Sequence, residues 1–332
     1  MQWLEFPSPQ VAVRGQVGAP RALLHRLPEA QRGAFPVDTW ERLTMSAGIR
    51  LAFVTDSPEV AVRLECLKVQ HPPGFCDVYL DGHYWSSFAG EWPGTFEPAV
   101  LSGLRGVHGV ELFMPAHCEV RVGGIGVAPG AQVAPPAARA RPLIVFHGDS
   151  ITHGSRSRRA GTSYPARVAR ALDAEFINLG VGGTARGEPG MAAAIAALPA
   201  DLIVLAFGVN TYGSACDPPV RFETIYDRFL GTIRAARPQV PIVLVTPLFH
   251  ARETQERNAC GAALEEYRRV IRQVALRRES FGDRRLVVVE GFGIIGPGDE
   301  DRLADHVHPN DQGFAAFADR LVPVLRRILP PA

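Results

Sequence analysis

The second half of the chain repeats one pattern five times, a short and mainly apolar run followed by a segment long enough to form a helix. The runs cover residues 143–146, 176–179, 202–207, 242–245 and 286–289. Strands that are apolar on both faces are typical of a parallel sheet covered by helices on either side. The pattern therefore predicts an α/β domain. In such a domain, ligands bind in the loops that follow the carboxyl ends of the strands.

Two of the segments outside these runs show helical spacing. Their apolar side chains recur at intervals of three or four residues, which places them on one face of a helix. We predict a helix over each segment, with Pro238 stopping the first one. The two apolar sets are Phe222, Ile225, Tyr226, Phe229, Leu230 and Ile233, and Phe314, Phe317, Leu321, Val324 and Ile328.

The first half of the chain shows the shorter period of β-strands. In residues 59–69 apolar side chains alternate with others until the phase slips to Leu67, which suggests a bulge. Asp81 and Gly82 form a good two-residue hairpin turn between two strand-like runs. Short strands separated by turn signals predict an antiparallel β-sandwich. The remaining strand-like runs cover residues 49–54, 75–80, 110–114 and 119–127.

A stretch rich in Ala, Pro and Gly separates the two halves. Residues 127–142 read VAPGAQVAPPAARARP and have no apolar periodicity, which is typical of a linker. With 332 residues, the chain is also longer than one average domain. We therefore expect a β-sandwich domain over residues 1–128, a linker over 129–141 and an α/β domain over 142–332. Pro135 and Pro136 should stiffen the linker.

Charge and composition exclude several classes of protein. The 35 basic and 34 acidic side chains leave a formal net charge of +1, which argues against a dedicated nucleic-acid binder. The first residues, MQWLEFPSPQ, lack the features of a signal peptide, and no stretch is long and apolar enough to span a bilayer. We expect a soluble, cytoplasmic protein with no membrane partner.

The cysteines show no spacing typical of a metal site or of a disulfide framework. Free thiols in a reducing compartment are therefore expected. The five residues are Cys66, Cys76, Cys118, Cys216 and Cys260.

Ser150 stands in a short motif after the first apolar run of the second half. Residues 147–154 read HGDSITHG. A serine at a tight strand-to-helix turn exposes its hydroxyl, and its backbone N–H lies near a helix N-terminus, where developing negative charge is stabilised. Asp and Ser are also favoured N-caps, so Asp149 and Ser150 could simply begin a helix.

A second motif precedes the last predicted helix. Asp305 and His308 lie three residues apart in the sequence ADHVHPNDQG. At this spacing a carboxylate can orient an imidazole, as a nucleophilic serine requires of its base. The alternative is again helix capping, here by Asn310 or Asp311.

Two smaller motifs follow the second and third apolar runs. Residues 178–185, NLGVGGTA, offer flexible backbone N–H groups, and residues 207–213, FGVNTYG, offer the side-chain amide of Asn210. Either motif could donate hydrogen bonds to an oxyanion, although Gly and Asn are common in any loop.

In this order, the four motifs resemble the sequence blocks of the SGNH, or GDSL-type, serine hydrolase superfamily over about residues 142–328. The resemblance implies a three-layer, flavodoxin-like parallel sheet. It assigns Ser150 as the nucleophile, with Asp305 and His308 completing a catalytic triad. It also implies an oxyanion hole formed by the backbone N–H groups of Ser150 and Gly183 and by the side-chain amide of Asn210.

One of these assignments has an alternative, and one neighbouring residue differs from the superfamily pattern. Gly182 takes the place of Gly183 in the oxyanion hole if the loop is shifted by one residue. Many members of the superfamily have Asp directly after the Asn of the third block, whereas this chain has Thr211. The support of the Asn210 loop therefore departs from the pattern of the superfamily.

The resemblance implies an enzyme that needs neither a metal nor an organic cofactor. Ser150 would attack an ester carbonyl, His308 would carry the proton to the leaving alcohol, and water would cleave the acyl-enzyme. The expected substrate is a small-molecule carboxylic ester of a small or carbohydrate-like alcohol, such as an acylated carbohydrate or polyketide. One alternative is an acyltransferase that passes the acyl group to an alcohol. Another is a non-catalytic carbohydrate-binding protein.

The order of the two predicted domains is similar to that in one group of bacterial carbohydrate esterases and in an acyltransferase that decorates aromatic polyketides. This similarity implies a jelly-roll-like sandwich in the first half of the chain. In those proteins the front domain can form one wall of the active-site cleft, and we expect the same of residues 1–128.

Two other ligand sites are less well supported by the sequence. Asp305, His306 and His308 could ligate a metal, but no further ligand cluster accompanies them. The GVGG sequence lacks the glycine spacing and the following acidic residue of a dinucleotide-binding fingerprint.

Further polar side chains flank the nucleophile motif. His147 and His153 could touch substrate, although loop histidines are more often surface residues. Arg156, Arg158 and Arg159 could bind an anionic acyl donor such as a coenzyme thioester. A solvated loop is the simpler interpretation of these arginines.

Overall fold

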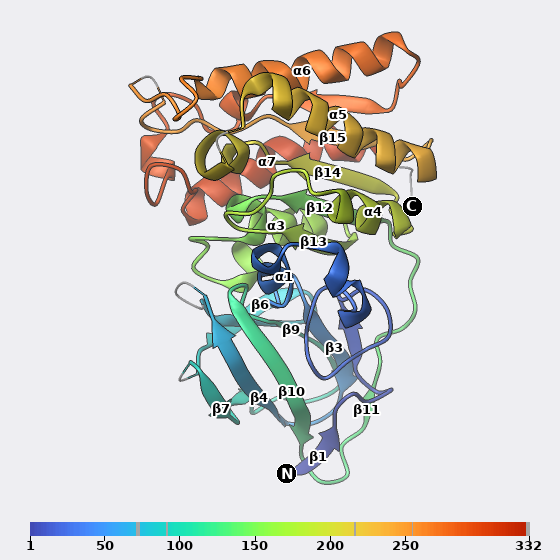
Figure 1. The fold of residues 1–332 in the computed structure, drawn as a ribbon. Helices are drawn as coiled ribbons and strands as arrows, with labels where there is room; N and C mark the ends of the chain where they lie inside the picture. Colours follow the sequence, from blue (N-terminus) through green and yellow to red (C-terminus); the bar gives the residue numbers. More distant parts are fainter. Residues whose placement is uncertain (71–73, 91, 216, 254, 330–332) are drawn as a thin grey trace. The chain divides into compact units, whose positions relative to one another are not determined.

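The computed structural model describes residues 1–70, 74–90, 92–215, 217–253 and 255–329, which form two compact units (Figure 1). The first unit comprises Met1–Ala30, Leu43–Ala140 and Arg158–Thr162. The second unit comprises Gln31–Arg42, Arg141–Ser157 and Ser163–Ala332. Each unit therefore contains a short segment from the other half of the sequence.

The first unit is a sandwich of two antiparallel sheets, as predicted (Figure 1). The strand order is β1-β10-β4-β7 in one sheet, where β8 also pairs with β4, and β11-β3-β9-β5-β6 in the other, where β2 also pairs with β3. The strands are β1 (Gln2–Glu5), β2 (Ala12–Arg14), β3 (Arg50–Thr55), β4 (Glu59–Val69), β5 (Cys76–Leu80), β6 (His83–Phe88), β7 (Gly94–Phe96), β8 (Ala99–Ser102), β9 (His108–Phe113), β10 (Cys118–Val127) and β11 (Val133–Ala134).

The two sheets bury a shared apolar core. Leu64 on β4 and Val122 on β10 belong to the same buried cluster as Phe53 on β3, Val78 on β5 and Leu112 on β9. Because alternate side chains of a strand point to opposite faces, this cluster explains the period of two in the sequence.

The predicted turn and bulge are both present. Asp81 and Gly82 join β5 to β6 with φ angles of 52° and 81°, which matches a hairpin turn that needs two residues of positive φ. On β4, Cys66 pairs with Val120 of β10 and Lys68 pairs with Glu119, so Leu67 is the extra residue of a bulge.

Part of the expected linker is structured. Within residues 129–141, β11 pairs with β3, and the Thr55 hydroxyl donates to the Gln132 carbonyl at 2.7 Å. The segment up to Ala140 belongs to the first compact unit.

The second unit is built on a five-stranded parallel sheet, also as predicted. The strand order β13-β12-β14-β15-β16 places the second strand at one edge and the first beside it, which is the flavodoxin-like order. The strands are β12 (Leu143–Gly148), β13 (Glu175–Gly180), β14 (Leu202–Ala206), β15 (Ile242–Val245) and β16 (Leu286–Val289).

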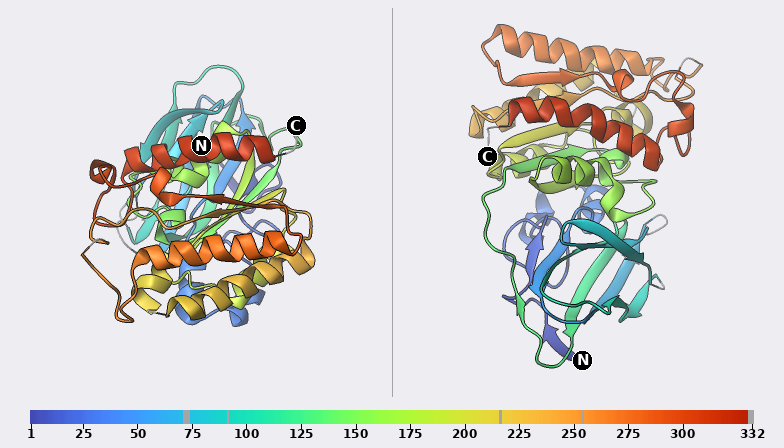
Figure 2. Two further views of the ribbon diagram at one scale, coloured as in Figure 1. Left: turned by 90° about the horizontal axis from the view of Figure 1, so that it is seen from above. Right: turned by 180° about the vertical axis from the view of Figure 1, so that it is seen from behind.

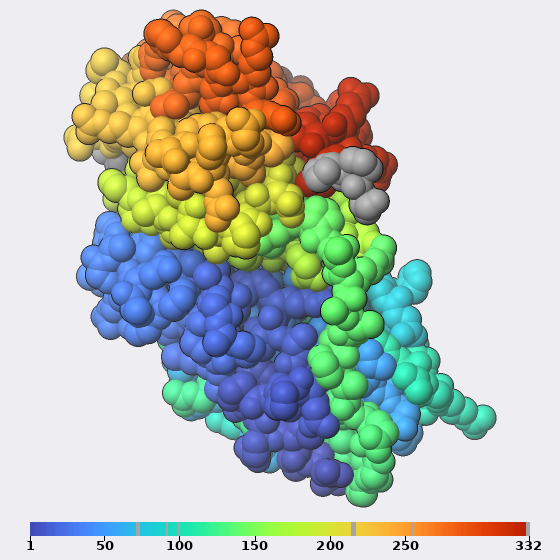
Figure 3. Space-filling view, turned by 90° about the vertical axis from the view of Figure 1, so that its right-hand side faces the viewer, coloured from blue at the N-terminus to red at the C-terminus, as the bar shows by residue number. Residues whose placement is uncertain are grey.

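Helices cover both faces of this sheet and make the three layers (Figure 2). On one face of the sheet, α3 packs against α7. On the other face, α5 packs against both α4 and α6. Helices α5 and α6 lie side by side at the surface in Figure 3. The helices are α2 (Ser150–His153), α3 (Tyr164–Ala171), α4 (Pro189–Ala197), α5 (Pro219–Ala236), α6 (Leu264–Ser280) and α7 (Asp311–Ile328). Both predicted amphipathic helices are present as α5 and α7, and α5 ends before Pro238.

One helix was not predicted from the sequence. Helix α1 (Val37–Leu43) comes from the first half of the chain, but residues up to Arg42 belong to the second unit. Its Trp40 is buried, with its ring centroid 5.9 Å from that of Phe35. A helix of seven residues is too short to show a helical period.

The cysteines that the structure describes form no disulfide bonds. Cys66, Cys76 and Cys118 are buried and Cys260 is exposed, while Cys216 lies outside the described residues. No helix within the described ranges is long and apolar enough to cross a membrane.

Candidate active site

Ser150 lies at a tight turn after β12, an inner strand of the parallel sheet. Strand β12 ends at Gly148, where any side chain would overlap the Ala206 carbonyl oxygen, so the turn requires glycine. Asp149 is the N-cap of α2 and accepts a hydrogen bond from the Ile151 N–H at 2.9 Å. The capping interpretation therefore holds for Asp149. It does not compete with a role for Ser150, which begins the helix.

The structure brings Ser150, His308 and Asp305 together in a line. Ser150 Oγ is 2.8 Å from His308 Nε2. On the other side of the ring, His308 Nδ1 is 3.0 Å from each oxygen of the Asp305 carboxylate. These side chains come from two loops that are far apart in sequence and that both follow parallel strands.

The local backbone favours an ionised Asp305. Its Oδ1 accepts hydrogen bonds from the N–H groups of Val307 and His308, at 2.9 and 2.8 Å. Partial burial opposes ionisation, but these bonds and the His308 ring outweigh it and hold the pKa of Asp305 well below its usual range. Arg156 Nε also donates to Asp305, at 3.1 Å. The carboxylate is thus negatively charged and fixed in direction.

Asp149 is a second carboxyl group close to the same histidine. Burial raises the pKa of Asp149 to about 6, although the hydrogen bond from Ile151 and the charge of His308 act in the opposite direction. Asp149 therefore lies close enough to His308 for charges on the two side chains to attract each other. The sequence motif contained Asp149, but nothing in it distinguished this role from capping.

The loop after β13 passes beside Ser150. A Cβ atom at Gly182 would lie 3.4 Å from Ser150 Cβ, and the Gly182 N–H donates to His153 Nδ1 at 3.3 Å. Gly183 has a φ of +77°, a conformation that L side chains rarely adopt. Gly182 therefore lies next to Ser150, and Gly183 follows it in a left-handed backbone conformation.

Asn210 is held by the same loop. Its Oδ1 accepts a hydrogen bond from the Ala185 N–H at 3.2 Å, which fixes which end of the amide is the oxygen. Thr211 begins a short π-helical turn and is fully buried. Within the described chain, its hydroxyl makes no hydrogen bond. Among the described residues, the Thr211 hydroxyl therefore gives the Asn210 loop no polar support.

The neighbouring histidines are not surface residues, contrary to the simpler expectation. His147 lies in β12, fully buried, with Nδ1 2.8 Å from the Leu179 carbonyl and its ring stacked on Phe229. His153 is also buried and holds the Gly182 N–H. His147 therefore belongs to the core, and His153 contacts the loop that passes beside Ser150.

His306 lies apart from the line of contacts around Ser150. Its carbonyl accepts a hydrogen bond from the Ala251 N–H, and its ring contacts Arg252. Among the residues that the structure describes, no group of three or more His, Cys, Asp or Glu side chains is arranged to hold a metal ion.

Of the arginines after α2, Arg156 and Arg158 are exposed and Arg159 is partly buried. Arg156 bonds to Asp305. Within the first unit, Arg159 lies over the Tyr84 ring, 3.9 Å from its centroid, and 3.7 Å from the buried Asp77 carboxylate. The solvated-loop interpretation therefore fits the exposure of Arg156 and Arg158, although Arg156 and Arg159 each also have an ionic partner.

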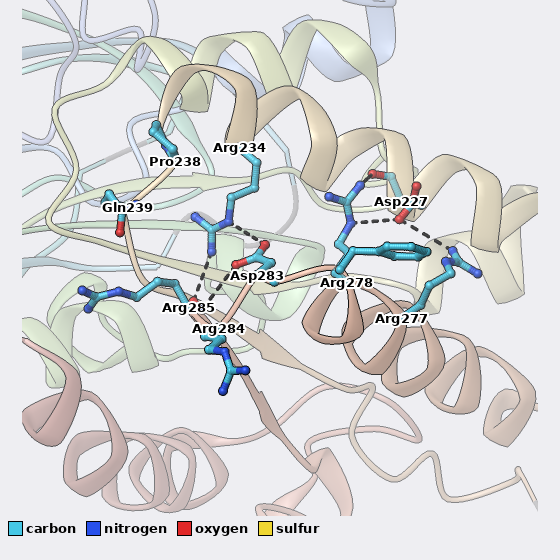
Figure 4. Close-up of a pocket in the computed structure, with 11 residues that line it drawn as sticks. Asp227, Arg234, Pro238, Gln239, Arg277, Arg278, Asp283, Arg284 and Arg285 are labelled. Carbon is cyan, nitrogen blue, oxygen red and sulfur yellow. Dashed lines mark hydrogen bonds and ion pairs between the residues drawn. The ribbon is translucent and has the colours of Figure 1, made fainter.

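A hollow of about 500 Å³ lies at the amino ends of β15 and β16, whereas Ser150 follows the carboxyl end of β12 (Figure 4). Its lining comes from α5, α6 and the loops that precede β15 and β16. Arg234 faces Asp283 at 2.7 Å, and Arg278 faces Asp227 at 2.8 Å. These arginines are neutralised by carboxylates, and the hollow contains none of the predicted site residues.

Two family models match the sequence. One, described as the GDSL-like lipase/acylhydrolase family, matches residues 146–316. The other, GxDLY, described as the N-terminus of SGNH hydrolase-type esterases, matches residues 1–92. None of the curated proteins is similar enough in sequence to count as a match.

Several solved structures have a similar fold over most of the chain. Salicylyl-acyltransferase SsfX3 from a tetracycline biosynthetic pathway is 26% identical, with a TM-score of 0.88 over 99% of each chain. A family two carbohydrate esterase from Clostridium thermocellum, in complex with cellohexaose, is 19% identical, with a TM-score of 0.68 over 85% of this chain and 92% of that one. An acetyl xylan esterase from Butyrivibrio proteoclasticus is 15% identical, with a TM-score of 0.70 over 98% and 99%.

Proposed function

The chain belongs to the GDSL-like lipase/acylhydrolase family, and from this membership we propose that it is a serine esterase acting on small-molecule carboxylic esters. The observation that carries the proposal is the continuous contact from Ser150 through His308 to Asp305. A hydroxyl becomes a nucleophile when an adjacent base can take its proton and a third group orients that base.

The reaction would proceed through an acyl-enzyme. As Ser150 Oγ attacks the carbonyl carbon, its proton passes to His308 Nε2, and the ionised Asp305 stabilises the imidazolium. The tetrahedral intermediate then collapses, the C–O bond of the ester breaks, and the imidazolium proton goes to the leaving alcohol. Water attacks the acyl-enzyme by the same route, which releases the carboxylic acid and restores Ser150.

Three donors would stabilise the developing oxyanion. They are the backbone N–H groups of Ser150 and Gly183 and the side-chain amide of Asn210. Gly183 is preferred over Gly182 because the Gly182 N–H already donates to His153. The hydrogen bond from Ala185 holds the Asn210 oxygen and so favours presentation of the amide NH₂ group.

Acyl transfer to an alcohol is the second candidate. It is favoured by the similarity to salicylyl-acyltransferase SsfX3 along 99% of both chains. Hydrolysis and transfer share one acyl-enzyme and differ in whether water or an alcohol attacks it. The substrate classes that follow are esters of carbohydrate-like alcohols for hydrolysis and an aromatic polyketide acceptor for transfer.

The test is activity on p-nitrophenyl esters of graded chain length, with and without alcohol acceptors. We expect Ser150→Ala to lose roughly a thousandfold or more in kcat while remaining folded, because members of a triad act as a unit. A serine-directed phosphonate should add one mass increment to the wild type and none to the variant. Labelling of Ser150→Ala would place the nucleophile elsewhere.

A matched pair of carboxylate variants tests the orienting residue. Asp305→Asn should reduce kcat strongly, whereas Asp311→Asn, at the first position of α7, should keep most of it. The opposite ranking would contradict the assignment of Asp305. A new ester product that forms at the expense of hydrolysis when alcohol is added would favour the transferase.

A further inference from the structure

Arg42 makes a direct hydrogen bond to the proposed oxyanion loop. Its Nε donates to the Gly182 carbonyl at 3.0 Å. The two residues are 140 positions apart in sequence, but both belong to the second compact unit. The guanidinium comes from α1, the short helix that the first half of the chain contributes to this unit.

The segment that carries Arg42 also lies next to the start of α4, directly after this loop. Any side chain at Gly190, in the first turn of α4, would overlap the Ala34 carbonyl oxygen. Burial raises the pKa of Glu188, and the charge of Asp38 on α1 raises it further. Trp40 of the same helix is buried, with its ring next to Phe35. The packing of this segment therefore holds the Arg42 backbone in place, within reach of Gly182.

The contacted carbonyl belongs to the same peptide unit as the Gly183 N–H, one of the three proposed oxyanion donors. The Gly182 C=O and the Gly183 N–H are parts of one planar trans peptide, so they point in opposite directions. An arginine that fixes the carbonyl on one side of the loop therefore fixes the direction of the N–H on the other side.

The loop needs such support at this point. The position of a Cβ atom on Gly183 has no neighbour within 4 Å, so side-chain packing does not restrain this residue. Glycine also permits more backbone conformations than other residues. A hydrogen bond from a charged donor is roughly twice as strong as a neutral one, and bonds in series polarise one another. The bond from Arg42 would both orient the peptide and make its N–H a better donor.

We propose that Arg42 is a positioning residue that holds the Gly182–Gly183 peptide so that the Gly183 N–H can donate to the oxyanion. This inference rests on the proposed function of the Ser150 site. Arg42 touches neither the ester nor the nucleophile in this scheme. Its effect should therefore appear in the transition state and leave the binding of the ground-state ester nearly unchanged.

The experiment compares Arg42→Met, which keeps the length of the side chain but not the donor, with Arg42→Lys, which keeps a cation. Loss of a direct oxyanion donor lowers kcat by about a hundredfold or more, so loss of its support in Arg42→Met should lower kcat by about tenfold with KM nearly constant. Arg42→Lys should fall between this variant and the wild type. Val37→Ala, at a position of α1 that is 74% exposed, is the control for the helix and should retain full activity.

A second readout separates positioning from folding. A boronic acid that forms a tetrahedral adduct with Ser150 should lose affinity for Arg42→Met by the same factor as kcat/KM, while phosphonate labelling still occurs at Ser150. Unchanged kcat in a folded Arg42→Met would overturn the inference. If Arg42→Met does not fold, unchanged kcat and boronate affinity in Arg42→Lys would overturn it instead. Full activity of Ser150→Ala would mean that the proposed function itself fails, whatever Arg42 does.

Discussion

Burial places Asp149, with a pKa of about 6, next to the proposed nucleophile. A rise from 3.8 to about 6 corresponds to roughly 3 kcal/mol of unfavourable free energy when the group is ionised in the folded protein. The unfolded chain releases this proton at about pH 4, and the folded chain releases it only at about pH 6. Stability should therefore fall as the pH rises through this window. A buried charge next to His308 thus has an energetic cost.

Asp149→Asn should remove that cost while keeping the helix cap, since Asn also accepts a hydrogen bond from the Ile151 N–H. We expect the variant to exceed the wild type in free energy of unfolding by up to about 3 kcal/mol at pH 8, and by little at pH 4. Urea unfolding at both pH values measures the difference. The exposed Asp319→Asn is the control, and a gain for Asp149→Asn that is equal at both pH values would contradict the argument.

At the level of single residues, the sequence predicted those parts of the site that are local in the chain. Ser150 with its turn, and Asp305 with His308, each lie within one short motif, and the structure brings the two motifs together. Arg42 could not be predicted, because nothing in its own neighbourhood points to a loop 140 residues away. His153 was visible but was interpreted as a surface residue, because its burial depends on packing.

At the level of elements, the loop after β13 depends on the backbone conformation of Gly183. Its positive φ of +77° is unfavourable for a side chain, yet the space around the position is open. Substitution should therefore strain the backbone without a steric clash. A residue forced into this region costs on the order of 1 to 2 kcal/mol. The peptide that carries the proposed oxyanion N–H would rotate to relieve this strain.

Gly183→Ala should therefore lower kcat by about tenfold or more, with a smaller change in the thermal unfolding midpoint than a core substitution would cause. Steady-state kinetics on p-nitrophenyl acetate and thermal unfolding together measure both effects. Gly293→Ala is the matched control, since Gly293 also has open space around it but no positive φ. If the two variants behaved alike, the conformation of Gly183 would not matter for catalysis.

The elements themselves were predicted where the pattern was long. The parallel strands and the helices α5 and α7 follow from runs and periods that span many residues, and the matching family confirms the resemblance read from the four motifs. Helix α1 and the short strands β1, β2, β7, β8 and β11 were missed, because they are too short to have a period. Their structure depends on contacts with residues far away in the sequence, and a local sequence pattern does not reveal such contacts.

For the whole molecule, each compact unit contains a segment from the other half of the chain. Residues 31–42 are part of the second unit, and residues 158–162, between α2 and α3, are part of the first. If residues 1–128 formed only a wall for bulky substrates, their removal should spare small esters. Because residues 31–42 support the loop after β13, their removal should instead affect every ester.

A truncated chain that begins at residue 129 should therefore lose activity on p-nitrophenyl acetate as well as on a bulky ester. The loss on acetate should at least equal that of Arg42→Met, since the truncation removes Arg42 together with the buried Trp40 of the same helix. Solubility should also fall, because the face that α1 covers becomes exposed. The measurement is kcat/KM for both esters in the full chain, the truncated chain and Arg42→Met. A soluble fragment with undiminished acetate activity would show that the second unit does not depend on residues 31–42.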